Sequence, residues 1–261
     1  MKTRLIPVLL LKNGQLVRSE SFQTHQILGN PVHEVERFNQ WTVDELIYLD
    51  ISDDDWIDGR EDMKVRRESS ALGILESVAS RCFMPLTFGG RIRTLDDVRD
   101  RVQRGADKIT LSRAAIETPS LITEAAKSFG SQAVVVVIDA KANGAGGWDV
   151  VYDHARRSAG RSPADWAREV ERLGAGEILI QSVDRDGSGE GYDLDLIRSV
   201  TGATTVPVIA VGGVGRLEHF AASVVEAGAS AAAAANIFHF VELSDRRAKR
   251  AMAKAGLDVR L

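Results

Sequence analysis

The sequence predicts a protein of the α/β class that folds as a single (β/α)8 barrel spanning residues 1–261. Three observations lead to this prediction. Eight short apolar runs alternate with helical patterns along the chain. The runs are apolar at successive positions, which is typical of parallel strands covered on both faces. The chain also reads as two related halves, and a closed barrel uses two equal halves better than a doubly wound open sheet does.

The two halves, roughly residues 1–130 and 131–261, each contain a glycine turn in the same setting. In the first half a proline-led apolar run ends at Gly89-Gly90, and in the second it ends at Gly212-Gly213. Such a turn before a helix brings backbone N–H groups together and is a candidate phosphate site. A tight strand-to-helix turn also needs glycine, so this structural explanation remains open. The flanking segments that correspond are Asp44–Asp50 with Gly176–Asp184, and Gly105–Ser112 with Gly228–Ala235.

The first half opens on the apolar run Leu5–Leu11, which predicts a buried strand. Asn13-Gly14 is a turn signal, and we expect a loop to follow it. A helix then begins at Pro31, since proline suits the first helical turn. That helix is expected to run to Trp41. The further elements expected in this half are, in order, a strand over Leu46–Ile51, a helix over Arg67–Ser80, a strand over Pro85–Phe88, a helix over Thr94–Arg104, a strand over Lys108–Leu111 and a helix over Pro119–Phe129.

The second half opens on Ala133–Asp139, the most strand-like run of the sequence. The glycine-rich Asn143–Gly147 and the short strand Trp148–Tyr152 predict a hairpin insertion after it. The further elements expected are a helix over Pro163–Leu173, a strand over Glu177–Ser182, a helix over Asp193–Thr201, and strands from Val206 and Ala229, each followed by a helix.

Composition and charge favour small metabolites as ligands. The net charge of −4 is mild and spread along the chain, which argues against a nucleic-acid or membrane partner. No leader pattern opens the chain and no apolar run approaches about 18 residues, so we expect a cytoplasmic protein. The loop Ser52–Asp58 carries three adjacent aspartates without ligand spacing, which favours a solvated loop over a metal site. No metal or other cofactor is expected.

Reactive residues of a barrel belong at the carboxyl ends of its strands. Aligning the halves pairs Leu10 after the first strand with Asp139 after the fifth. A carboxylate in that place can act as a general acid or base, or can cap a turn or pair with Lys141 instead. The residues expected at the strand ends are Leu10, Asp50, Gly89-Gly90, Ser112, Asp139, Asp184–Gly187, Gly212-Gly213 and Asn236.

From end to end the chain resembles the cyclase subunit of imidazole glycerol phosphate synthase, a TIM barrel of histidine biosynthesis that takes ammonia from a glutaminase partner. The motifs that carry the resemblance are Phe129–Val136, Ile138–Lys141, Gly174–Leu179, Asp184–Gly187 with Gly191-Tyr192, and Phe238–Phe240.

The resemblance implies a substrate with two phosphates and a glutaminase at the amino-terminal face of the barrel. Asp139 would be one of two catalytic carboxylates, and Asp186, at the same end, would help to bind the phosphorylated substrate. One phosphate site would use Gly89, Gly90 and Ser112, and the other would use Gly187, Gly212, Gly213 and Asn236. A gate of ion pairs for ammonia would use Arg4, Glu45, Lys108 and Glu177.

Two positions depart from the family pattern. The family's first strand reads Ile-Pro-Cys-Leu-Asp-Val-Lys, with a catalytic Asp where this sequence has Leu10. The family's third glycine after the third strand is Arg91 here. This combination resembles a divergent branch associated with amidination of surface-polysaccharide sugars, in which the barrel relays ammonia to a separate ATP-dependent sugar amidotransferase.

Two alternatives stay open at this point. The chain could be an authentic cyclase subunit of histidine biosynthesis that tolerates the change at Leu10. It could also be a non-catalytic scaffold that binds and activates a glutaminase. Ammonia transfer through the barrel separates the relay from the scaffold, and cyclase activity separates the authentic subunit from both.

Overall fold

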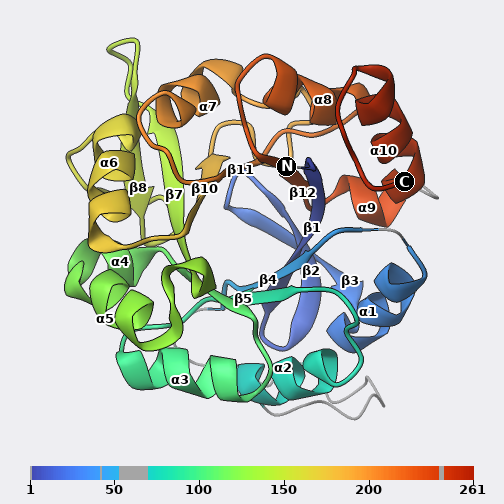
Figure 1. The fold of residues 1–261 in the computed structure, drawn as a ribbon, viewed down its shortest axis with the longest axis horizontal. Coiled ribbons are helices and arrows are strands. Elements are labelled where there is room, and N and C mark those ends of the chain that lie inside the picture. Colours follow the sequence, from blue (N-terminus) through green and yellow to red (C-terminus); the bar gives the residue numbers. More distant parts are fainter. Residues whose placement is uncertain (1, 42, 53–69, 241–243) are drawn as a thin grey trace.

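A computed structural model describes residues 2–41, 43–52, 70–240 and 244–261. Eight parallel strands close into a barrel with the helices outside it, as Figure 1 shows, and the predicted fold is confirmed. The last strand pairs with the first in parallel, Arg4 opposite Ala231. In order around the barrel, the strands are β1 (Arg4–Lys12), β4 (Leu46–Asp50), β5 (Leu86–Gly89), β6 (Lys108–Leu111), β7 (Val134–Ala142), β10 (Glu177–Ser182), β11 (Val208–Val211) and β12 (Ala231–Ala234).

Side-chain caps mark where several helices begin. Asn30 accepts a hydrogen bond from the amide of Val32, and Ser162 accepts one from the amide of Asp165. Thr94 and Asp97 form a reciprocal capping box, which typically stabilises a helix by about 1 kcal/mol. The helices are α1 (Pro31–Gln40), α2 (Ala71–Ala79), α3 (Leu95–Gln103), α4 (Arg113–Glu117), α5 (Ser120–Phe129), α6 (Pro163–Leu173), α7 (Leu194–Thr201), α8 (Glu218–Val225), α9 (Ile237–Phe240) and α10 (Ser244–Lys254), with a 3₁₀ turn, η1, at Ser131–Ala133.

A hairpin follows β1 where the sequence predicted a loop, so that prediction was wrong. Its strands are β2 (Gln15–Glu20), antiparallel to β1, and β3 (Thr24–Gly29). Asn13 and Gly14 both take left-handed dihedrals, with φ of 49° and 75°. A two-residue turn of this kind matches the twist of an antiparallel pair, so the turn signal marked a hairpin.

The hairpin that the sequence did predict, after β7, is present. β8 (Trp148–Tyr152) runs antiparallel to β7, and the two-residue strand β9 (Arg157–Ser158) pairs with β8. The short helix α4 after β6 was not predicted. The helix expected from Arg67 is described from α2 onward, and residues 67–69 lie outside the described part, as do Asp53–Asp58 of the acidic loop.

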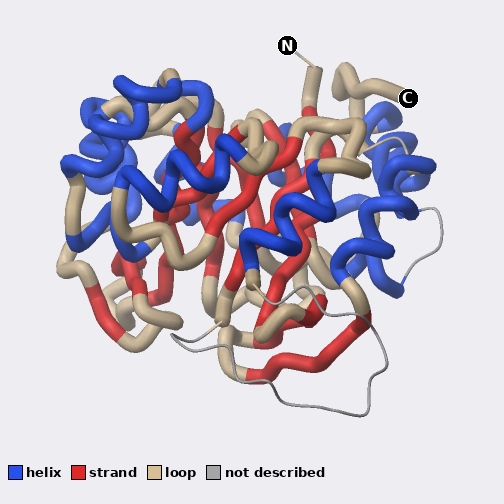
Figure 2. The backbone as a smooth tube through the Cα atoms, turned by 90° about the horizontal axis from the view of Figure 1, so that it is seen from below, coloured by secondary structure: helices blue, strands red, loops and turns tan. Residues whose placement is uncertain are grey.

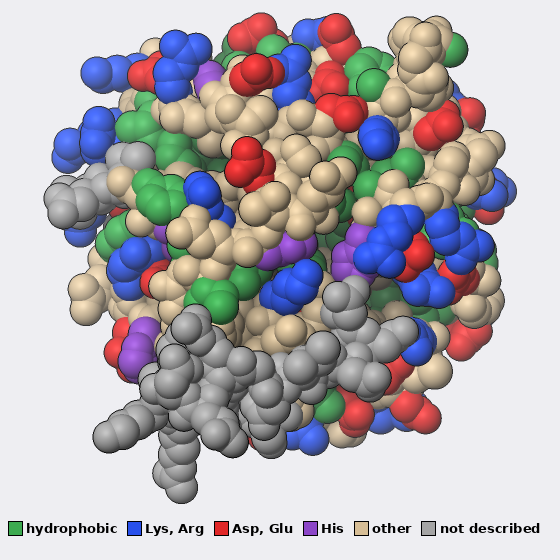
Figure 3. Space-filling view, turned by 180° about the vertical axis from the view of Figure 1, so that it is seen from behind, with side chains coloured by type: hydrophobic (Ala, Val, Ile, Leu, Met, Phe, Trp, Pro, Cys, Tyr) green, Lys and Arg blue, Asp and Glu red, His purple; other side chains and the backbone are tan. Residues whose placement is uncertain are grey.

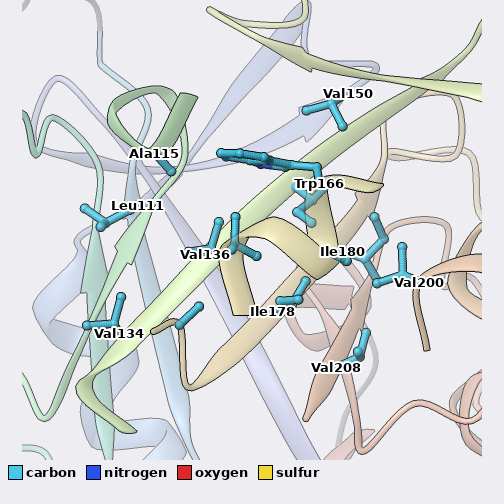
Figure 4. Close-up of a cluster of buried hydrophobic side chains, with 14 of the residues drawn as sticks. Leu111, Ala115, Val134, Val136, Val150, Trp166, Ile178, Ile180, Val200 and Val208 are labelled. Atoms are coloured by element: carbon cyan, nitrogen blue, oxygen red, sulfur yellow. The ribbon is translucent and has the colours of Figure 1, made fainter. Parts of the chain in front are cut away.

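Apolar side chains fill the space between the strands and the helices. Figure 4 shows Trp166 of α6 over Val136 and Ile180, all of them at most 1% exposed. A separate cluster fills the inside of the barrel. Burying one such side chain contributes about 1.5–3 kcal/mol, so both layers support closure. Residues of the inner cluster include Ile6, Val8, Leu10, Ile47, Val135, Val137, Leu179, Ile209 and Val211.

The two ends of the barrel differ. Both chain termini lie at the amino ends of the strands (Figure 2). The two hairpins extend β1 and β7 at the carboxyl ends. Within the described ranges, no helix combines the length and the apolar character needed to cross a membrane.

Candidate functional site

The carboxyl ends of the strands surround a cavity of about 430 Å³. Asp139 of β7 and Leu10 of β1 line it, one from each half of the chain, and Gly90, Ser112 and Gln181 line it as well. The cavity therefore collects strand-end residues of the first half together with Asp139 and Gln181 of the second half. Figure 3 views this face of the molecule.

Asp139 is the carboxyl group best suited to acid or base chemistry there. It accepts a hydrogen bond of 3.3 Å from the hydroxyl of Ser112. Burial, and to a smaller extent the charge of Asp186, raise the pKa of Asp139 to about 7, although the hydrogen bond from Ser112 opposes the shift. The hydrogen-bond partner of Asp139 is Ser112, and not Lys141, the partner that the sequence left open. A carboxyl with this pKa exchanges protons readily at neutral pH.

Leu10 occupies the place where the resemblance leads one to expect a second carboxylate. The side chain is 8% exposed, lines the cavity and packs with Val8 and Val137 inside the barrel. A leucine can neither accept nor donate a proton. On the side of β1, therefore, the cavity presents an apolar surface to any ligand.

Asp50 is a cavity residue to which the sequence analysis assigned no role. It is 4% exposed, and its Oδ1 accepts hydrogen bonds from the amide and the hydroxyl of Ser52, at 3.0 and 2.5 Å. Its Oδ2 is buried without a hydrogen-bond partner among the described residues. Only its place at the end of a strand could have drawn attention to it.

The first glycine turn packs so tightly that side chains are excluded. A Cβ on Gly90, whose φ is 94°, would lie 2.0 Å from the carbonyl oxygen of Asp50, and one on Gly89 would lie 1.7 Å from the hydroxyl of Thr110. The next residue, Arg91, also has a positive φ, 56°. Ser112 precedes α4 without capping it, so its hydroxyl is directed to Asp139. The packing alone explains both glycines, and the turn remains open to an anion on its cavity side.

The second glycine turn is equally tight. Gly212 and Gly213 have φ of 100° and 95°, and a Cβ on Gly213 would lie 2.1 Å from the carbonyl oxygen of Gly191. Gly187 lies against the β2–β3 hairpin, where a Cβ would meet the Cα of Glu20 at 2.8 Å. These contacts place the hairpin beside the residues predicted to hold the second phosphate.

Asp186 and Asn236 hold that hairpin. The hydroxyl of Ser19 donates to Asp186 at 2.8 Å, the amide of Phe22 donates to it at 3.2 Å, and the Nδ2 of Asn236 donates to the carbonyl of Ser19 at 3.1 Å. Burial raises the pKa of Asp186 although these donors oppose the shift. Two residues predicted to contact the ligand therefore make hydrogen bonds to a hairpin that the sequence analysis did not foresee.

The four residues predicted for the gate meet at the other end of the barrel. Arg4 lies 2.5 Å from Glu45 and 2.8 Å from Glu177, and Lys108 lies 3.1 Å and 3.0 Å from the same two carboxylates. Cation and anion alternate around a closed ring. Burial opposes the charge of Arg4, but the two glutamates outweigh it, so the pKa of Arg4 is raised.

The ring lies at the entrance to the apolar inside of the barrel. Glu45 immediately precedes β4, and Arg4, Lys108 and Glu177 are the first residues of β1, β6 and β10. Glu45 and Glu177 are 7% and 8% exposed. Buried charges of this kind persist when each is paired, since breaking one pair leaves an uncompensated charge.

Metal ligands do not gather in the described ranges. No group of three or more histidine, cysteine, aspartate or glutamate side chains is placed there to hold an ion. The described lining of the cavity offers carboxyl groups, hydroxyls and basic side chains.

Comparison with known proteins matches nearly the whole chain. A family model described as "Histidine biosynthesis protein" matches residues 4–244. The chain is 42% identical, over 260 residues, to the imidazole glycerol phosphate synthase subunit HisF of Gluconacetobacter diazotrophicus, covering 100% of this chain and 96% of that protein. Proteins of the same name from two strains of Caulobacter vibrioides are 44% identical over 266 aligned positions, covering 100% of this chain and 97% of each relative.

Proposed function

The chain belongs to the histidine biosynthesis protein family, and on that premise we propose that it is the barrel subunit of a cytoplasmic glutamine amidotransferase. A glutaminase would bind at the amino ends of the strands and deliver ammonia into the barrel. The observation that carries the proposal is the closed ring of Arg4, Glu45, Lys108 and Glu177 at that entrance.

The interior behind the ring suits ammonia better than ammonium. Apolar residues, among them Ile6, Val135 and Leu179, occupy the space between the ring and the cavity of Asp139. An unpaired buried charge costs several kcal/mol, whereas small neutral ammonia avoids that cost. If the ring opens for a neutral molecule while its charges stay paired, ions would still be excluded from the barrel.

Leu10 favours relay of the ammonia over its use inside the barrel. Ring closure by two carboxylates needs proton transfer on both sides of the substrate, and Leu10 leaves Asp139 to serve one side. The proposed role is therefore that of the divergent branch. Ammonia would pass to a separate ATP-dependent amidotransferase that amidinates a nucleotide-linked or surface-polysaccharide sugar.

Imidazole ring closure is the second candidate. The names of the relatives support it more directly than they support relay, since each is called an imidazole glycerol phosphate synthase subunit. The pKa of about 7 at Asp139 would serve one of the proton transfers, and the two glycine turns would hold the two phosphates of the substrate.

One assay separates the two uses of ammonia. The purified chain is given ammonium salt and the histidine-pathway substrate, beside the HisF protein of Caulobacter vibrioides. A missing acid or base typically lowers a rate by about 10²–10⁴-fold, so we expect turnover lower by that factor or none at all. Turnover equal to that of the reference protein would establish the second candidate.

The ammonia passage has its own test in the complex with the glutaminase. Lys108→Met removes one cation from the ring and leaves Glu45 and Glu177 with Arg4 alone. With the ATP-dependent amidotransferase and its sugar substrate added, we expect glutamine hydrolysis to continue while transfer of ¹⁵N from glutamine to the amidinated sugar falls. Lys127→Met, at an exposed position of α5, is the control that should keep hydrolysis and transfer coupled. Coupling that is indifferent to Lys108 would leave the chain as a scaffold that activates the glutaminase.

A further inference from the structure

A second cavity, of about 420 Å³, adjoins the one that contains Asp139. It lies between the tip of the β2–β3 hairpin and the turn from β8 to β9. Phe22, His25, His154 and Arg156 line both cavities. The two are thus neighbouring compartments of one hollow, and a single ligand can reach from one into the other.

The lining of the two cavities differs in charge. The first contains acidic side chains, among them Asp50, Glu117 and Asp139. In the second, every titratable lining residue is basic, and all of its lining residues belong to the described part of the chain. Figure 3 shows histidine side chains beside lysine or arginine side chains near the middle of this face. The basic residues of the second cavity are Lys12, His25, Lys141, His154 and Arg156.

Two hairpins supply these side chains in the same way. Lys12 lies two residues beyond Leu10 on β1, and Lys141 lies two residues beyond Asp139 on β7. Because side chains alternate along a strand, each lysine projects on the same face as the cavity residue before it. His25 belongs to the hairpin that extends β1, and His154 to the hairpin that extends β7. Both ends of the cavity therefore carry a cation and an imidazole.

Lys12 donates a hydrogen bond to His25 at one end of the second cavity. Their Nζ and Nδ1 atoms are 3.4 Å apart. An ammonium group only donates hydrogen bonds, so Nδ1 is the acceptor and the neutral ring carries its proton on Nε2. Lys12 and His25 are thereby held next to each other at the β1 end of the cavity.

The turns that bound the cavity hold unusual backbone conformations. Ser21 and Phe22 have φ of 53° and 59°, and Asp153, His154 and Ala155 have φ of 55°, 58° and 60°. Residues other than glycine are strained in the left-handed region, because their Cβ comes too close to the following carbonyl oxygen. Strain of this kind is concentrated at ligand-binding sites, where it places a side chain that relaxed backbone would not.

We infer that the second cavity is an anion subsite for a diphosphate group of the substrate, separate from the two glycine turns. Three permanent cations and two imidazoles suit a group with several negative charges better than a single carboxylate. The rest of the substrate would extend into the first cavity, toward Asp139. The inference rests on the proposed function and deepens it: this barrel would itself hold the diphosphate of the nucleotide-linked sugar at the end where ammonia emerges, for the separate amidotransferase to act on. Binding of the diphosphate needs neither the ring nor the glutaminase.

Calorimetric titration with inorganic pyrophosphate tests it on the full chain. Lys12→Met and Lys141→Met remove one charge each and keep the aliphatic stem of the side chain. Because a charge-assisted hydrogen bond contributes about 1.5–3 kcal/mol, each variant should bind about tenfold more weakly or worse. The double variant should lose about a hundredfold, Lys141→Arg should retain most of the affinity, and thermal melts should show that every variant is folded.

One control and one rival variant keep the result specific to this cavity. Lys127→Met, which removes an exposed lysine elsewhere, should leave pyrophosphate affinity unchanged, whereas Ser112→Ala tests the first glycine turn as the rival anion site. Wild-type protein that does not bind pyrophosphate, or a double lysine variant that binds as tightly as wild type, would overturn the inference. Loss with Ser112→Ala alone would overturn it as well, by moving the anion to the glycine turn. None of these outcomes depends on ammonia transfer, so failure of the proposed function would be seen separately.

Discussion

The hydroxyl of Ser112 lies 3.3 Å from Oδ2 of Asp139, across the carboxyl ends of the paired strands β6 and β7. This hydrogen bond favours the ionised carboxylate, yet burial is the larger effect and keeps the pKa of Asp139 at about 7. The folded protein therefore holds a proton on Asp139 under conditions in which the unfolded chain releases it.

Replacing Asp139 with asparagine should stabilise the protein, and the gain should depend on pH. Below about pH 4 the carboxyl is protonated in both states, so the change should be small. As pH rises from about 4 to 7, ionisation of the unfolded chain lowers the stability of the wild type but not of the variant. Since the pKa moves from 3.8 to about 7, the gain should reach a few kcal/mol above pH 7.

Urea unfolding of Asp139→Asn at several pH values measures this gain. Asp195→Asn, at an exposed position of α7, is the matched control and should change the free energy of unfolding by under about 0.5 kcal/mol at every pH. A stability difference between Asp139→Asn and wild type that is constant from pH 4 to 8 would contradict the raised pKa.

Loss of the Ser19 hydroxyl should loosen the β2–β3 hairpin. Ser19 is 4% exposed, and its hydroxyl is one of the donors to the buried carboxylate of Asp186. Ser19→Ala removes that donor, so the pKa of Asp186 should rise further and the hairpin should lose about 1–3 kcal/mol of local stability. Hydrogen exchange of residues 15–29 should accelerate, whereas exposed Thr24→Ala should leave it unchanged. Equal protection in Ser19→Ala and wild type would show that the other contacts suffice.

Arg91→Gly should be tolerated, although a change to glycine usually destabilises a folded protein. Arg91 has φ of 56°, and relief of that conformation is worth about 1–2 kcal/mol, which offsets the entropy that glycine loses on folding. Exposed Arg93, two residues on, has no positive φ, so Arg93→Gly should be the less stable variant. Thermal melting of both variants measures the difference. The opposite order of stability would mean that contacts of Arg91 outweigh its backbone strain.

Apolar patterning was enough to predict the barrel. Runs such as Val134–Ile138 and Ile178–Ile180 are buried at every position, because inward and outward faces of a barrel strand are both covered. Pro163 and Gly174 marked the ends of α6 by their fixed or left-handed dihedrals. Local signals of this kind need no knowledge of distant residues.

The β2–β3 hairpin shows where such reasoning fails. Leu16 and Val17 are both buried, so β2 lacks the alternation that identifies an antiparallel strand, and β3 is largely exposed. Asn13-Gly14 is the local signal of the turn, but by itself it does not distinguish a hairpin from the start of a loop. The contacts of Ser19 with Asp186 and Asn236 join residues more than 160 positions apart, which no local pattern reveals. The role of the second glycine turn consequently depends on a segment that the sequence left unassigned.

Leu10→Asp should restore part of the ring-closing activity, because it places a carboxyl in the cavity that Asp139 already lines. A positioned acid or base contributes about 10²–10⁴-fold, and we expect at least a tenfold gain with ammonia and the histidine-pathway substrate. The gain should fall short of the full factor, since Arg91 remains beside the first glycine turn.

Leu10→Asn is the decisive control for the aspartate variant. It has nearly the same shape and polarity, suffers the same loss of apolar packing, and moves no proton. A gain in Leu10→Asp that Leu10→Asn lacks would assign the missing step to proton transfer. Equal, negligible rates in both variants would mean that the cavity has lost more than one carboxylate, and would leave relay as the use of the ammonia.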